Sequence, residues 1–318
     1  MNETSPYQLV FRGATVVDGT GAPRYRADVA VREGKIEAIG KVPQAQAQET
    51  VDARDLVLAP GFIDAHTHDD RAVLATPSMP AKVSQGVTTV VTGNCGISLA
   101  PLDGVEPTPP LNLIGSRSMF HPTFDSYFDT LARNPAAINV AAQVGHTALR
   151  RAAMDNLDVA ATAAEIGEMQ RQLEAAMRAG CIGMSTGLAY PPANAAPTEE
   201  VIALVERLRK YGGIHTTHMR NEKEGVLESV RETLEIGRRA GVPVVISHHK
   251  CSGRENWGAT RETLALIEQA QKEQSVDLDV YPYTASSTVL LPDFVASAER
   301  VLITWSEQAP EQAGRDLA

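Results

Sequence analysis

The stretch IHTTHMRNEKEGVLESVRETLEIGRRAGVPVVISHHK, residues 214–250, decides the fold. It begins with a short predicted strand at 214–218 and continues through an amphipathic segment at 222–240, which stops at Gly241. An apolar run that predicts the next strand follows at 242–248. Strand, helix and strand in this order are typical of a parallel sheet built from βα units.

The same alternation extends over most of the chain and predicts seven strands and the helices between them. Residues 163–179 form a typical helix, because Thr162 and Glu165 have capping-box spacing and Gly180 suits the left-handed position after the last turn. Further helices are predicted at 199–211 and 261–274. The predicted strands are Val57–His66, Val87–Asn94, Ile138–Val144, Ile182–Thr186, Ile214–His218, Val242–His248 and Val276–Tyr281.

Seven βα units in a row favour a TIM-like (β/α)8 barrel whose last unit is missing. A doubly wound sheet fits less well, because no glycine-rich phosphate turn follows the first strand. The front of the chain differs, since 9–17 and 27–39 are β-rich runs punctuated by Asp18-Gly19 and Glu33-Gly34. We therefore expect a small, incomplete β-sandwich-like subdomain at 1–56 and barrel strands 1–7 at 57–283.

Composition excludes several classes of partner. Lys and Arg number 29 against 39 Asp and Glu, a net charge of -10 with no basic run, which disfavours nucleic acid. No signal peptide and no apolar run near the roughly 20 residues of a membrane span are present, so we expect a soluble, cytoplasmic protein. The three cysteines, Cys95, Cys181 and Cys251, lie far apart, which disfavours a disulfide framework.

Five metal-compatible side chains stand at the ends of predicted strands. His66 and His68 end the first strand in GFIDAHTH, and strand alternation points both imidazoles to one side. Cys95 ends the second strand in VTGNCG, while His218 and His248 end the fifth and sixth. Each has a plain structural alternative, a polar pair at a strand end or a buried inert thiol. Together they favour a metal site at the barrel mouth, where active sites of this fold assemble.

Imidazole and thiolate donors suit Zn²⁺ rather than Mg²⁺ or Ca²⁺. Bound zinc makes hydroxide available at neutral pH and polarises carbonyl groups, which suits amide hydrolysis. Alternation directs His248 and Lys250 to one face and His249 to the other. We interpret His121, His146, His215 and His249 as structural.

With these residues in view, the chain resembles the amidohydrolase superfamily, and within it the N-acyl-D-amino-acid deacylases. GFIDAHTH is similar to the metal-binding first strand of the superfamily, and VTGNCGISLAPL, HMRNE, SHHK and DVYPYTASST are similar to the deacylase branch. The resemblance implies a hydrolase that cleaves an N-acyl-D-amino acid, its small-molecule substrate, into a carboxylate and a free D-amino acid.

The resemblance also implies a role for each matching residue. Cys95, His218 and His248 would hold a tightly bound Zn²⁺, and His66 and His68 would belong to a second, weaker site. Lys250 and Tyr281 would contact the substrate carboxylate, with Tyr281 chosen over Tyr283.

The chain departs from the family pattern at its C-terminus. Family members continue to an eighth strand whose aspartate is the general base, and residues 284–318 resemble the start of an insertion typical of the branch. We therefore expect a truncated chain without catalytic competence. Two alternatives stay open, a cyclic-amide hydrolase of the dihydroorotase or hydantoinase kind, and a non-catalytic metal-binding barrel. The preferred side chain, the number of metals and the oligomeric state are not predicted.

Overall fold

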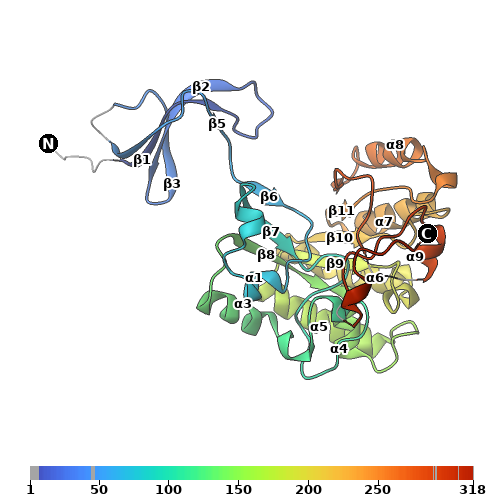
Figure 1. Ribbon diagram of the computed structural model, residues 1–318. Coiled ribbons are helices and arrows are strands. Elements are labelled where there is room, and N and C mark those ends of the chain that lie inside the picture. The colour runs from blue at the N-terminus through green and yellow to red at the C-terminus, as the bar shows by residue number, and fades with distance from the viewer. Residues whose placement is uncertain (1–6, 44–46, 289, 291, 307, 318) are drawn as a thin grey trace. The chain divides into compact units, whose positions relative to one another are not determined.

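The computed structural model describes residues 7–43, 47–288, 290, 292–306 and 308–317 (Figure 1). The chain divides into two compact units, Met1–Phe62 and Ile63–Ala318. Within the described residues, every helix is too short or too polar to cross a membrane.

The first unit is a twisted sheet with strand order β3-β2-β1-β4, in which β5 also pairs with β1. Its strands are β1 (Tyr7–Val16), β2 (Tyr25–Arg32), β3 (Lys35–Gly40), β4 (Ala47–Asp52) and β5 (Val57–Leu58). The turn at Glu33 and Gly34, both with positive φ, makes β2 and β3 antiparallel neighbours. Its buried side chains form two small clusters, one that includes Ala14 and Val29 and one that includes Val10.

The second unit is built on a seven-stranded sheet whose strand order, β6 to β12, is the order of the chain. The strands are β6 (Phe62–Asp64), β7 (Val87–Thr92), β8 (Asn139–Gly145), β9 (Gly183–Gly187), β10 (Ile214–His218), β11 (Val244–Ile246) and β12 (Val276–Leu278). All pairs from β7 to β12 are parallel. A doubly wound sheet would reverse its order partway, so this arrangement confirms the predicted barrel type with seven units.

Helices follow the strands and pack against one another in sequence, α4 on α5, α5 on α6, α6 on α7 and α7 on α8. The longer helices are α3 (Phe124–Arg133), α4 (His146–Ala153), α5 (Ala163–Ala179), α6 (Thr198–Val205), α7 (Val226–Ala240) and α8 (Thr260–Ala270). The short ones are α1 (Ala72–Ala75), α2 (Pro80–Val83) and α9 (Pro292–Ser297). Short 3-10 segments lie at Leu111–Leu113, Arg117–Met119, Ala193–Ala195, Glu206–Tyr211, Arg254–Asn256 and Pro310–Gln312.

The helix over 163–179 begins and ends as predicted. Thr162 accepts a hydrogen bond from the Glu165 N–H, the Glu165 carboxylate returns the contact, and Gly180 is left-handed with a φ of 119°. The helix predicted over 199–211 is instead the α-helix α6 continued by a 3-10 segment that ends at Gly212.

The strand predicted over Val57–His66 is wrong as a single element. Val57 and Leu58 pair with β1, while β6 belongs to the second sheet. Pro60 lies between the two strands and has no N–H for a sheet ladder, which explains the break. The first sheet thus extends beyond the boundary predicted at residue 56.

Candidate metal centre

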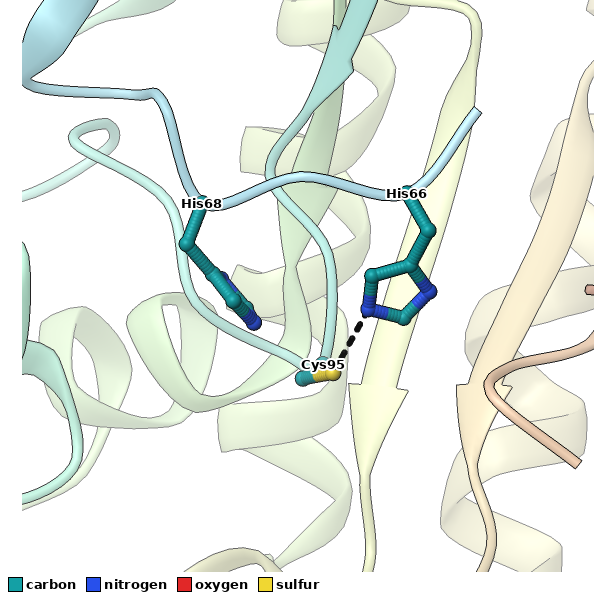
Figure 2. Close-up of side chains that lie close together, drawn as sticks. All are labelled: His66, His68 and Cys95. Carbon is teal, nitrogen blue, oxygen red and sulfur yellow. Dashed lines mark hydrogen bonds between the residues drawn. The ribbon is translucent and has the colours of Figure 1, made fainter. Parts of the chain in front are cut away.

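The candidate site lies at the C-terminal ends of β6, β7, β10 and β11. Two groups of side chains have donor atoms within 4.8 Å of one another, His66 with His68 and Cys95, and Cys95 with His218 and His248. Figure 2 shows His66 and His68 turned toward Cys95 from the segment that follows β6. The structure thus brings together all five of the predicted ligands.

Cys95 occupies a turn into which neighbouring backbone packs very closely. Its φ is 53°, in the left-handed region that non-glycine residues seldom adopt, and its side chain is buried. A Cβ on Gly93 would lie 2.1 Å from the Gln143 carbonyl oxygen, and one on Gly187 would lie 2.2 Å from the Cys95 carbonyl oxygen. Glycine at both positions is therefore required for β7, β8 and β9 to hold the thiol in place.

The Cys95 thiol is the donor common to both groups. Its Sγ lies 3.4 Å from Nε2 of His66 and 3.5 Å from Nε2 of His248. Zinc bonds of about 2.0–2.3 Å in a tetrahedron separate neighbouring donors by roughly 3.5 Å, so these distances fit the ion. Burial raises the pKa of the thiol, and the charges of Glu222 and Asp279 add to this, so the thiolate needs a cation to form.

His218 completes the second group from the end of β10. Burial lowers its pKa to about 3, so the imidazole is neutral and can donate a lone pair. Within the described residues its buried Nδ1 has no hydrogen-bond partner, as expected of an atom available to a metal.

Glu222, which the sequence reading missed, lies beside His248 and Lys250. Its carboxylate oxygens are 3.0 Å from Nδ1 of His248 and 2.6 Å from Nζ of Lys250. Burial opposes its charge, but the contact with His248 and the charge of Lys250 hold its pKa at about 2. A signal was present, because Glu222 follows His218 by four residues in HMRNE.

Lys250 does face the same region as His248, as predicted, although strand alternation is not the reason. β11 ends at Ile246, and His248 has a left-handed φ of 36°. Nζ of Lys250 lies 3.1 Å from Nδ1 of His248, whereas Nε2 of His249 lies 2.9 Å from Oγ1 of Thr263 in α8.

The segment around His66 and His68 is held at both ends by Lys82 of α2. Its Nζ lies 2.6 Å from Oδ2 of Asp64 and 3.0 Å from Oδ2 of Asp69. The histidine pair therefore lies in a short loop closed by two ion pairs rather than in an extended strand.

Tyr281 lies near Lys250, with the Lys250 ammonium 5.8 Å from its ring centroid. The Tyr281 side chain is half-buried, whereas Tyr283 is 74% exposed. Of the two tyrosines in YPY, Tyr281 is thus the one beside the candidate site.

The remaining histidines have partners away from the two groups. His215 contacts Oγ1 of Thr186 at 3.1 Å, and His146 contacts Glu200 at 3.0 Å, both in buried surroundings. The His121 ring packs edge-on against Tyr127.

A family model described as the Amidohydrolase family matches residues 49–282. Among curated relatives, D-aminoacylase of Alcaligenes xylosoxydans xylosoxydans is 50% identical over 99% of this chain and 66% of its own length. N-acyl-D-aspartate deacylase of the same organism is 50% identical over 98% of this chain and 63% of its own. The chain thus spans about two thirds of the length of these relatives.

Solved structures give the same picture. A crystal structure of D-aminoacylase matches with a TM-score of 0.95 and 49% identity, covering 98% of this chain and 66% of that one. N-acyl-D-glutamate deacylase from Bordetella bronchiseptica, complexed with zinc and a phosphonate inhibitor, matches with a TM-score of 0.91, 44% identity and coverage of 98% and 66%. An L-hydantoinase from Arthrobacter aurescens, 16% identical over 87% of this chain and 58% of that one with a TM-score of 0.55, shares the fold alone.

The family match covers most of this chain and includes the ends of β6, β7, β10 and β11, where all five candidate ligands lie. This chain belongs to the amidohydrolase family.

Proposed function

We propose that this chain carries the metal centre of a zinc-dependent hydrolase that cleaves the amide of N-acyl-D-amino acids. The observation that supports the proposal best is the Cys95 thiol, buried and within 3.5 Å of imidazole nitrogens from two different strand ends. The two deacylases with 50% identity support the substrate class.

Cys95, His218 and His248 would hold one zinc ion, and His66 and His68 would hold a second with the shared thiolate. When bound, zinc would polarise the scissile carbonyl and favour ionisation of water at neutral pH. The buried, neutral His218 imidazole and the buried Cys95 thiolate would keep these two donors fixed and shielded from bulk water.

The substrate carboxylate would be bound by Lys250 with help from Tyr281. In the structure Lys250 is already paired with Glu222 at 2.6 Å, so the ammonium is fixed in position before a substrate arrives. A substrate carboxylate would have to share the Lys250 ammonium with Glu222, which weakens its contact with Lys250. Ligands that also contact Tyr281 would therefore bind better.

The proposal includes a cytoplasmic location, which the three free cysteines support, since disulfides are rare there. The small-molecule substrate is the only partner proposed. A cyclic-amide hydrolase is the second candidate, but the 16% identity to the hydantoinase supports only the fold.

The test is zinc content of the purified chain, measured by elemental analysis beside Cys95→Ala and Cys181→Ala. Cys181 is also buried, but it lies in the apolar core and belongs to neither donor group. We expect zinc in the native chain and in the Cys181 variant, and its loss in the Cys95 variant. Retention of zinc by Cys95→Ala would contradict the ligand assignment.

The substrate class is tested with this chain joined to the missing C-terminal portion of a close relative, by hydrolysis of N-acetyl-D-methionine, with N-acetyl-L-methionine and a hydantoin in parallel. Cleavage of the D-compound alone supports the deacylase. Hydantoin cleavage with no turnover of either N-acetyl amino acid would favour the cyclic-amide alternative.

A further inference from the structure

Asp279 is a second acidic residue at the site that the sequence reading missed. It follows β12, and its backbone is fixed by β11, because its N–H donates to the Ile246 carbonyl at 3.0 Å. Its own carbonyl accepts the His249 N–H at 2.8 Å. The side chain is therefore presented from a rigid strand end.

The Asp279 carboxylate contacts one member of each donor group. Its Oδ2 lies 3.1 Å from Nδ1 of His66, and its Oδ1 accepts the backbone N–H of His248 at 2.6 Å. His66 follows β6, at one end of the sheet order, and His248 follows β11, next to the strand at the other end, so a single side chain joins β6 and β11 at the site.

We propose that Asp279 is a positioning residue that holds His66 and His248 in the orientation required for metal binding. The inference rests on the proposed metal centre and adds to it the residue that links its two halves. Asp279 would act through the two histidines rather than on the substrate.

The contact with His66 orients its ring. A carboxylate only accepts hydrogen bonds, so Nδ1 is the donor in this contact and Nε2 is the nitrogen left to face a metal. Nε2 is the atom that faces Cys95 at 3.4 Å. A carboxylate placed behind a ligating histidine in this way orients the ring and raises its basicity.

The contact with His248 acts on the backbone. A φ of 36° is unfavourable for a residue with a Cβ, and a hydrogen bond from its N–H to a carboxylate helps to hold it. The same conformation directs Nε2 of His248 toward Cys95 at 3.5 Å.

Asp279 is not itself placed as a ligand. Both of its oxygens are engaged by His66 and His248, and neither of the two donor groups found among the described residues includes it.

The experiment compares Asp279→Asn with Asp277→Asn, a control on the same strand whose side chain is exposed. Zinc affinity is measured by competition with a chelator, and Co²⁺ loading reports the thiolate-to-metal absorption of Cys95. We expect Asp279→Asn to weaken metal binding roughly 10–100-fold and to change the cobalt spectrum. Asp277→Asn should match the native chain in both.

A double-mutant cycle with His66→Ala separates positioning from a general effect on the fold. If Asp279 acts partly through His66, the loss caused by Asp279→Asn is smaller in the His66→Ala background. An equal loss in both backgrounds would contradict a role through His66.

Three further outcomes would overturn the proposal. One is unchanged zinc affinity and cobalt spectrum in Asp279→Asn. Another is a metal-free Asp279→Asn chain that melts far below Asp277→Asn, which would make the residue structural. A native chain that binds no zinc would instead remove the proposed metal centre, and this inference with it.

Discussion

Gly187, at the end of β9, packs closely against the backbone of Cys95. A Cβ there would lie 2.2 Å from the Cys95 carbonyl oxygen, a backbone atom that cannot move without shifting the thiol. We expect Gly187→Ala to lower the free energy of unfolding by about 1–3 kcal/mol and to weaken zinc binding. Urea unfolding and chelator competition measure the two effects.

Gly167 in α5 is the matched control, because a Cβ there would meet nothing within 4 Å. Alanine in a helix interior is favoured over glycine, so Gly167→Ala should raise the free energy of unfolding by about 0.5–1 kcal/mol. If Gly187→Ala were as stable as Gly167→Ala, the close packing of Gly187 against the Cys95 carbonyl would not limit stability, which would contradict this prediction.

At the same scale, the sequence predicted which histidines gather with Cys95 because each stands at a strand end. It did not predict Glu222 or Asp279, since an acidic residue near a strand end is common and its partners come from distant strands. The sequence also did not predict how His66 and His68 are held. Lys82 pairs with Asp64 and Asp69 on either side of them, so they lie in a loop, where the side-chain alternation of a strand does not apply.

At the scale of elements, α4 and α6 are joined by a buried ionic cluster. Glu200 contacts Arg150 at 2.5 Å and His146 at 3.0 Å, and all three side chains are almost fully buried. Burial alone would raise the pKa of Glu200, but its contacts with His146, Arg150 and the Ala161 N–H hold it at about 2, below the ordinary 4.5.

Glu200→Gln leaves the Arg150 charge buried without its counter-ion, so we expect it to cost about 3–5 kcal/mol of stability at pH 7. Glu199→Gln removes the neighbouring, exposed pair with Arg239 and should cost far less stability, because solvent screens this pair. Urea unfolding of both variants at pH 7 checks the difference, and similar losses would contradict the cluster's role.

The depressed pKa of Glu200 also sets a pH dependence. A carboxyl whose pKa is lowered by folding stabilises the protein above its unfolded pKa, and this stability is lost as pH falls through the folded value. We expect about 3 kcal/mol to disappear between roughly pH 4.5 and pH 2 in the native chain. The free energy of unfolding of Glu200→Gln should fall less over this pH range. Urea unfolding of the native chain and the variant at a series of pH values between about 5 and 2 measures the difference.

Helix ends were predictable because local chemistry sets them, as Thr162, Glu165 and Gly180 show. The break between β5 and β6 was not anticipated, since the apolar pattern runs across it. The stretch contributes β5 to the first sheet and β6 to the second. Which sheet a residue joins depends on pairing with strands far away in the sequence.

For the molecule as a whole, metal binding should stabilise the second unit, because the donors join the ends of β6, β7, β10 and β11. At a free zinc concentration 100 times Kd, the gain is about 2.7 kcal/mol. We expect a chelator to lower Tm by roughly 5–10 °C in the native chain. Calorimetry with and without chelator measures the shift.

Cys95→Ala, which lacks the shared donor, should show no such shift. A chelator effect of equal size in that variant would place the stabilising metal elsewhere.

The strand order of the second sheet has a consequence for synthesis on the ribosome. Neighbouring strands in the sheet are also neighbours in the chain. Only 29 residues separate His66 from Cys95, whereas 153 residues separate Cys95 from His248. A nascent chain therefore presents His66, His68 and Cys95 long before His218 and His248 are made. The group with the fewest residues between its donors is the first that can capture a metal ion during translation.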